Sequence, residues 1–132
     1  MSSLEIVHTA AAPPVNGHYS QAMVHGETVY VSGQLGRGPR MSDEEAGDIT
    51  AQTRRALAAV KAIVLAAGSD MSHVLKMTVY VSDVALWPAV NAEDEKALGV
   101  HRPARAIVPT NALHFGALVE IDAIAAVIRK PG

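Results

Sequence analysis

The segment that most constrains the fold spans residues 48–67, where apolar side chains recur on one face of a helix. They are Ile49, Ala56, Leu57, Val60, Ile63, Val64 and Ala67. Asp48 can cap the N-terminus of this helix, because its carboxylate accepts hydrogen bonds from free amide groups, and Gly68 can end it. A helix with one apolar face must bury that face against another element, so the chain needs a second layer beside it.

Segments with a strand pattern surround this helix and can form the second layer. Apolar runs, alternation and turn residues predict strands over residues 5–8, 20–25, 28–32, 74–81, 104–108 and 118–127. A second helix is predicted over residues 83–98, and the glycine-rich residues 33–47 are predicted to be a loop. In the strand at 74–81, one face is expected to carry Leu75, Met77, Val79 and Val81. The order predicts a single α+β domain over residues 1–132, with a mixed six-stranded sheet and two helices packed on one face. No third helix is available for the other face, so we expect other subunits to cover it.

Composition excludes several classes of function. Eleven Lys and Arg stand against thirteen Asp and Glu, and this balance disfavours nucleic-acid binding, which depends on a basic excess. The chain has no cysteine, so disulfides and thiolate chemistry are excluded. The six histidines lack the close spacing of a metal site, and no phosphate-binding glycine motif follows a strand, so we expect no metal and no cofactor. Neither a signal peptide nor a membrane-spanning run is visible, which predicts a cytoplasmic protein that does not bind membranes.

Two charged residues lie inside apolar strands and are the strongest candidates for chemistry. Arg105 interrupts the strand at 104–108, and Glu120 interrupts the strand at 118–127. An unpaired charge in such a place costs several kcal/mol. Two interpretations therefore stay open. The residues can form a structural ion pair, or they can form a ligand site in which the guanidinium binds a carboxylate and the acid acts on water.

Several segments along the chain resemble one family in order and spacing. They are Val-Tyr-Val-Ser-Gly-Gln at 29–34, the segments at 59–68 and 74–83, Val-Asn at 90–91, Pro-Ala-Arg-Ala-Ile-Val at 103–108 and Leu-Val-Glu-Ile-Asp-Ala-Ile-Ala at 118–125. Together they resemble the Rid family (reactive intermediate deaminases, YjgF/YER057c/UK114). The resemblance implies a chorismate-mutase-like fold and a homotrimer with clefts between subunits. It also implies cofactor-free hydrolysis of 2-imino and 2-enamino acids, of the 2-aminoacrylate type, to 2-oxo acids and ammonia.

The resemblance assigns roles to individual residues. Arg105 is expected to bind the substrate carboxylate, and Glu120 to position the attacking water; both are the expected catalytic residues. Further contacts to the substrate are expected from Tyr19, Ser32, Gly33, Asn91 and Ile107. Without the resemblance, Tyr19 can equally be a packed aromatic and Ser32 a strand-end residue, whereas the sequence alone favours Asn91 as a solvated helix residue.

Three departures from the family bear on the substrate. His18 stands where the family has proline, Ile107 stands where well-studied members have cysteine, and the stretch at 96–102 is shorter than usual. These departures keep a second hypothesis open, a trimer that binds a small carboxylate such as a 2-oxo acid without turnover. Endoribonuclease or translation-inhibitor activity is the least favoured hypothesis, because the sequence shows neither a basic patch nor an aromatic platform for RNA.

Overall fold

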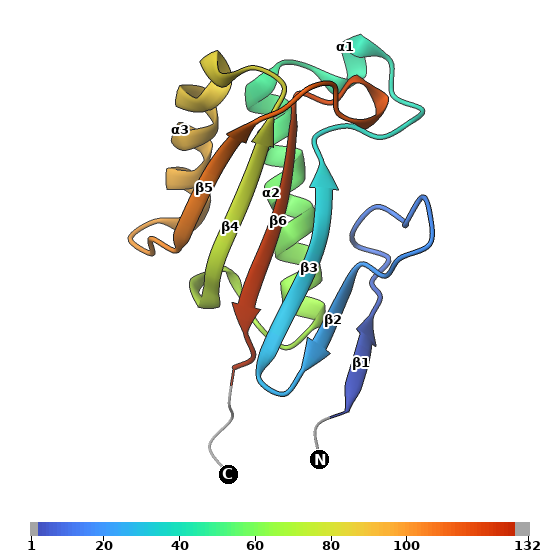
Figure 1. Ribbon diagram of the computed structural model, residues 1–132, viewed down its shortest axis with the longest axis vertical. Helices are drawn as coiled ribbons and strands as arrows, with labels where there is room; N and C mark the ends of the chain where they lie inside the picture. The colour runs from blue at the N-terminus through green and yellow to red at the C-terminus, as the bar shows by residue number, and fades with distance from the viewer. Residues whose placement is uncertain (1–2, 129–132) are drawn as a thin grey trace.

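The computed structural model describes residues 3–128 as one twisted sheet with helices behind it (Figure 1). The strand order is β1-β2-β3-β6-β4-β5, and every neighbouring pair is antiparallel except β4 and β5, which are parallel. The strands are β1 (Leu4–Val7), β2 (Ala22–His25), β3 (Thr28–Leu35), β4 (Val74–Val81), β5 (Ala104–Pro109) and β6 (Val119–Ala126). The predicted α+β class with a mixed six-stranded sheet is confirmed. No helix within residues 3–128 is both long and apolar enough to cross a membrane.

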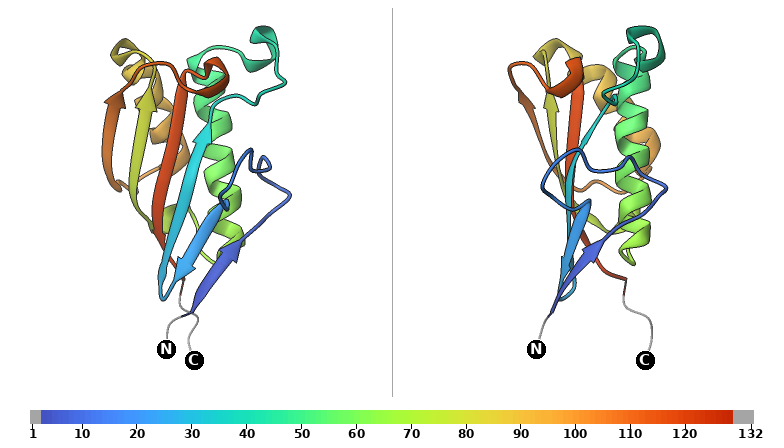
Figure 2. Two further views of the ribbon diagram at one scale, coloured as in Figure 1. Left: turned by 45° about the vertical axis from the view of Figure 1, so that its right-hand side comes forward. Right: turned by 90° about the vertical axis from the view of Figure 1, so that its right-hand side faces the viewer.

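The helices α2 (Ile49–Ala66) and α3 (Trp87–Leu98) lie on the same face of the sheet, as predicted (Figure 2). Ile63, Val60 and Val64 of α2 are fully buried against apolar side chains of the central strands. Asp48 caps the helix by accepting a hydrogen bond from the amide of Ala51 at 3.0 Å. The one-sided pattern therefore places α2 as expected.

The prediction of the second helix and the prediction of the glycine-rich loop both need correction. The helix predicted from residue 83 begins at Trp87, because Asp83 accepts a hydrogen bond from the amide of Ala85 and starts a separate turn. The predicted loop at 33–47 contains the end of β3 and a short helix, α1 (Asp43–Ala46). A capping box at Ser42 and Glu45 stabilises this helix, and that signal was present in the sequence.

The side-chain alternation of β4 differs from the prediction at its first residues. The pairing of β4 with β6 shifts register between Val74 and Lys76. An extra residue in one strand turns the following side chains to the other face. Val74 is therefore fully buried with Met77, whereas Leu75 is 52% exposed.

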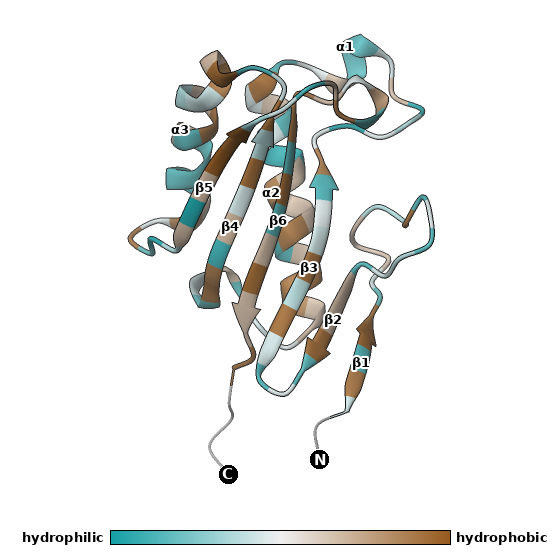
Figure 3. Ribbon diagram, viewed as in Figure 1, coloured by the Kyte–Doolittle hydropathy of each residue, from teal (hydrophilic) through white to brown (hydrophobic). Residues whose placement is uncertain are grey.

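The sheet face opposite the helices is uncovered within one chain. Alternate residues of β6 point to the core, and those between them, including Glu120 and Asp122, point to this open face. Figure 3 shows hydrophobic and hydrophilic positions mixed along the strands. Several large apolar side chains are exposed on this face, namely Leu4, Ile6, Tyr30 and Val108. The open face thus has the character of a contact surface.

Candidate functional site

Arg105 lies on the edge strand β5 and points to the helix side of the sheet. It is paired with Met77 of β4, whose side chain is in the core, and paired residues of neighbouring strands point to the same face. Its Nη1 donates hydrogen bonds to Oδ1 of Asn91 at 2.9 Å and to Oδ2 of Asp94 at 3.0 Å, both on α3. The ion-pair partner of Arg105 is therefore Asp94, and the predicted alternative of an Arg105–Glu120 pair is wrong.

A cavity of about 870 Å³ lies beside this guanidinium. Its lining comes from the C-terminal part of α3 and the segment that leads into β5: Asn91, Asp94, Glu95, Leu98, Gly99, His101, Arg102, Pro103 and Arg105. The Nε and Nη2 atoms of Arg105 have no hydrogen-bond partner among residues 3–128. This pair of donors matches the spacing of a carboxylate, so the cavity can receive an anionic ligand at the guanidinium. Arg105, Asn91 and Asp94 are called the Arg105 half-site below.

Ile107 follows two positions after Arg105 on the same face of β5. It is partly buried and packs against the hydrophobic core, beside Val79 of β4. Ile107 does not line the cavity beside Arg105, and its side chain belongs to the core next to the half-site.

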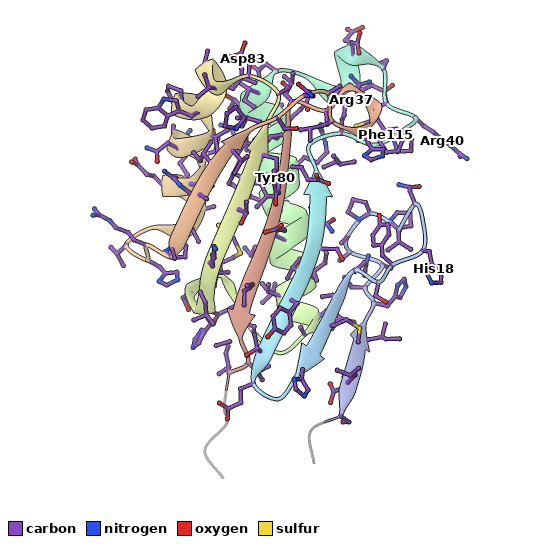
Figure 4. All side chains as sticks on the ribbon, viewed as in Figure 1. His18, Arg37, Arg40, Tyr80, Asp83 and Phe115 are labelled. Carbon is purple, nitrogen blue, oxygen red and sulfur yellow. The ribbon has the colours of Figure 1, made fainter. Side chains whose placement is uncertain are left out.

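Glu120 lies on β6 and points to the open face, next to Tyr80 of β4 in the pairing. Burial raises the pKa of the Glu120 carboxyl; nearby His114 opposes this rise, and the negative charge of Asp122 adds to it. A carboxylate with a raised pKa is a stronger base than an ordinary glutamate, which suits proton transfer from water. Figure 4 shows Tyr80 near the middle of this face, toward the same end as Phe115.

Gly33 leaves the space that the Glu120 carboxylate occupies. The pairing of β3 with β6 shifts register between Val31 and Gln34, where Gly33 lies. A Cβ on Gly33 would lie 2.8 Å from Oε2 of Glu120, closer than ordinary contact. Any larger residue at this position must therefore displace the carboxylate. Gly33 and Glu120 are called the Glu120 half-site below.

Ser32 precedes Gly33 on β3, and Tyr19 lies in the loop that leads into β2. The hydroxyl of Ser32 donates to the carbonyl of Ser20 at 2.6 Å, and its amide donates to the carbonyl of Gln21 at 2.9 Å. The buried side chain of Gln21 bonds to the backbone of Thr9 and Pro13, which holds the whole loop in place. The hydroxyl of Ser32 is thus engaged by the protein itself.

Tyr19 is half exposed and accepts a hydrogen bond from the amide of Asn16 at 3.2 Å. It lines a second cavity, of about 770 Å³, together with Gly33 and Phe115. His18 is exposed and lies on the outer side of the loop (Figure 4). The tyrosine is therefore on the same side of the molecule as the Glu120 half-site, and it is not near Arg105.

Sequence reasoning missed two residues of these surroundings. Asp94 was marked only by its spacing, three residues after Asn91, which places both on one stripe of a helix. Phe115 has a φ of 60° in the left-handed region and is 40% exposed beside the second cavity. No sequence pattern marked Phe115.

The two half-sites lie on opposite faces of the sheet and are separated by β4. Asn91 and Ile107 lie on the side of Arg105. The other three residues lie on the side of Glu120: Gly33, Ser32 and Tyr19. One chain therefore does not bring its seven candidate residues together. No group of three or more His, Asp and Glu side chains within the described chain is placed to hold a metal ion.

Comparison with known proteins identifies the family. The family model described as endoribonuclease L-PSP matches residues 9–127. The chain belongs to this family, the Rid (YjgF) family. A goat (Capra hircus) Rid protein named 2-iminobutanoate/2-iminopropanoate deaminase is 40% identical over 127 residues, which cover 95% of this chain and 93% of that protein. The human protein of the same name is 36% identical, with the same coverage.

Solved structures of Rid proteins have the same fold. Escherichia coli TdcF, crystallised with bound serine, superimposes with a TM-score of 0.85 at 32% identity, over 94% of this chain and 99% of that one. The YjgF product of Escherichia coli gives a TM-score of 0.84 at 35% identity, over 92% and 98% of the two chains.

Proposed function

We propose that this protein hydrolyses 2-imino and 2-enamino acids to 2-oxo acids and ammonia. The observation that carries the proposal is that Arg105 lines a cavity and keeps its Nε–Nη2 edge free of protein partners, an edge that fits a substrate carboxylate. The raised pKa of Glu120 supplies the matching base. The goat and human relatives named as deaminases of such imines support the same substrate class.

A complete site then needs two copies of the chain. Arg105 and Glu120 point to opposite faces, so Arg105, Asn91 and Ile107 of one copy must meet Glu120, Gly33 and Tyr19 of the next. The uncovered sheet face, with half of the Tyr30 side chain exposed, offers the surface for this assembly. We therefore propose the homotrimer that the family resemblance implies, with one site between each pair of neighbouring subunits.

The proposed reaction uses the side chains alone. Nε and Nη2 of Arg105 bind the carboxylate, and an enamine substrate first tautomerises to the imine. Glu120 accepts a proton from a water molecule, and the water oxygen forms a bond to C2. Starting from the imine protonated on nitrogen, the proton then passes from Glu120 to the amino group of the carbinolamine. Glu120 takes up the hydroxyl proton as the C–N bond breaks, so that ammonia leaves and the C=O bond of the 2-oxo acid forms. Positioned acid–base help of this kind contributes roughly 10²–10⁴-fold.

Ammonia release from an imine made in situ by an amino-acid oxidase tests the proposal. We expect Arg105→Ala to raise KM strongly and Glu120→Gln to lower kcat by about 10²-fold or more. Lys61→Ala, an exposed change on α2, is the matched control and keeps the wild-type rate. Equal rates for wild type and Arg105→Ala, at equal folding, would reject the role of Arg105. Light scattering of the purified protein tests the trimer, and a monomer that retains full activity contradicts the shared site.

One observation favours a second candidate, a binding module without turnover. Asp94 already supplies Arg105 with an anionic partner, as in a site tuned for reversible binding of carboxylates. Binding of 2-oxobutanoate with no ammonia release from any imine of a panel would support this alternative over the deaminase.

A further inference from the structure

We propose that Asp94 is a positioning residue that fixes the orientation in which Arg105 meets a ligand carboxylate. The inference rests on the proposed function only for the chemistry of the ligand, a small 2-oxo or 2-imino acid. Its structural basis is that Asp94 and Asn91 both bond to the same atom, Nη1, at 3.0 Å and 2.9 Å.

This arrangement decides which edge of the guanidinium is free. Nη1 carries two hydrogens, and the two α3 side chains take both of them. The N–H groups left over belong to Nε and Nη2, which together form the fork that binds a carboxylate through two hydrogen bonds. Asp94 thus fixes the guanidinium of Arg105 through Nη1 and leaves Nε and Nη2 free to bind a ligand carboxylate.

Asp94 is paired less completely than a purely structural acid would be. Its side chain is only 4% exposed, and Oδ1 is buried without a hydrogen-bond partner among residues 3–128. Burial raises the pKa of the Asp94 carboxyl, and the Arg105 guanidinium opposes the rise. A buried carboxylate is most stable when both of its oxygens accept hydrogen bonds, so the single paired oxygen of Asp94 lowers the stability of the fold. Such a compromise is typical of groups arranged for function.

The preceding residue, Glu93, shows what a structural acid on the same helix looks like. Its side chain is 5% exposed, and both oxygens are paired, Oε2 with Nε of Arg54 at 3.1 Å and Oε1 with Nζ of Lys96 at 3.2 Å. The pair with Arg54 links α3 to α2, the pair with Lys96 lies within α3, and none of these three residues lines the cavity beside Arg105. Glu93 is therefore a matched control for Asp94, because both are buried acids on one turn of α3.

Asp94 acts on an anionic ligand in two opposite ways, and the variants separate them. Its contact to Nη1 orients the guanidinium, while its negative charge weakens the attraction of Arg105 for a second anion. Asp94→Asn keeps an oxygen acceptor and removes the charge, whereas Asp94→Ala removes both. Ordering one long side chain on binding weakens affinity by about threefold to tenfold, and this is the effect that positioning avoids.

The test measures binding of 2-oxobutanoate by calorimetry and, in parallel, KM and kcat for an imine. We expect Asp94→Ala to raise Kd and KM by about threefold to tenfold with kcat within about twofold of wild type. Asp94→Asn restores most of the affinity, and Glu93→Ala leaves Kd and KM unchanged while lowering the Tm. The positioning role is overturned if Asp94→Ala and Asp94→Asn both bind as tightly as wild type or more tightly, or if Glu93→Ala weakens binding equally.

Nuclear magnetic resonance of the wild-type protein gives a readout that needs no Asp94 variant to fold. The Arg105 signals are assigned from their loss in Arg105→Lys. We expect addition of 2-oxobutanoate to shift the Nε and Nη2 protons of Arg105 and to leave the Nη1 protons in place. A shift confined to Nη1, or rapid averaging of all four Nη protons in the free protein, contradicts the proposal.

The binding and turnover measurements test the positioning role of Asp94 and the deaminase activity separately. Wild-type protein that binds 2-oxobutanoate but releases no ammonia refutes the deaminase, and the role of Asp94 is then decided by Kd alone. Wild-type protein that releases ammonia, with Asp94 variants of unchanged Kd and KM, refutes the positioning role and leaves the deaminase standing. Absence of any binding to 2-oxo acids overturns the inference.

Discussion

Gly33 offers the sharpest test of how the open face is built around Glu120. In Gly33→Ala, the new Cβ would lie 2.8 Å from Oε2, 2.9 Å from Cδ and 3.2 Å from Cγ of Glu120. The carboxylate must move by about 0.6 Å to restore a contact of 3.4 Å, the lower limit of ordinary packing. Because the clash involves the end of a flexible side chain, Glu120 yields and the backbone stays, at a conformational cost of about 0.5–1.5 kcal/mol.

The displaced base should impair turnover more than binding. Misplacement of a catalytic group by about 1 Å costs up to 10²-fold, so we expect kcat for imine hydrolysis to fall by about 10- to 100-fold in Gly33→Ala. KM should change little, since the carboxylate of the substrate is bound by Arg105 on another strand and face. The Tm should fall by about 3–6 °C for each kcal/mol of the conformational cost given above.

Gly38→Ala is the control for this experiment, because a Cβ there meets nothing within 4 Å. Both variants are compared with wild type by ammonia release under saturating imine and by thermal unfolding. A Gly33→Ala protein with wild-type kcat refutes the claim that this glycine sets the place of the catalytic carboxylate. A large loss of kcat in Gly38→Ala refutes it as well, because the effect is then not specific to the Glu120 contact.

Three further predictions follow from the same geometry. Burial holds the pKa of Glu120 above its ordinary value, so kcat should begin to fall on the acid side at a higher pH than for an ordinary glutamate. Asp122→Asn removes a negative charge that raises this pKa, so the acid-side fall of kcat should move to lower pH. An unchanged pH profile in Asp122→Asn contradicts the assignment of Glu120 as the base. Ser32→Ala removes the bond to the Ser20 carbonyl, so unfolding should become easier by about 1 kcal/mol and limited proteolysis of the loop at 9–21 faster; unchanged proteolysis argues against a holding role. Ile63→Ala, at a fully buried position of α2, should lower the free energy of unfolding in urea by about 2–5 kcal/mol, and a loss below 1 kcal/mol would mean that the core beneath the sheet is loosely packed.

The arrangement of the half-sites could be predicted only in part. The charges in apolar strands singled out Arg105 and Glu120, because a charge in such a place needs a partner or a wet cavity. Which partner each one finds depends on the face to which it points. That face follows from strand pairing and register, which bring together residues far apart in the chain. The direct pair, one of the two interpretations that the sequence left open, was therefore wrong, and Asp94 was found only in the folded structure.

By itself, the sequence determined the class of fold, because periods of two and of three to four residues are local properties of the chain. It determined α2 and its cap, the strand at 74–81, and the residues worth examining. Only the tertiary structure decided the strand order, the register shifts next to Val74 and Gly33, and the separation of Arg105 from Glu120 by β4. A shift of one residue turns every later side chain to the opposite face of a sheet, and no local pattern records where such a shift occurs.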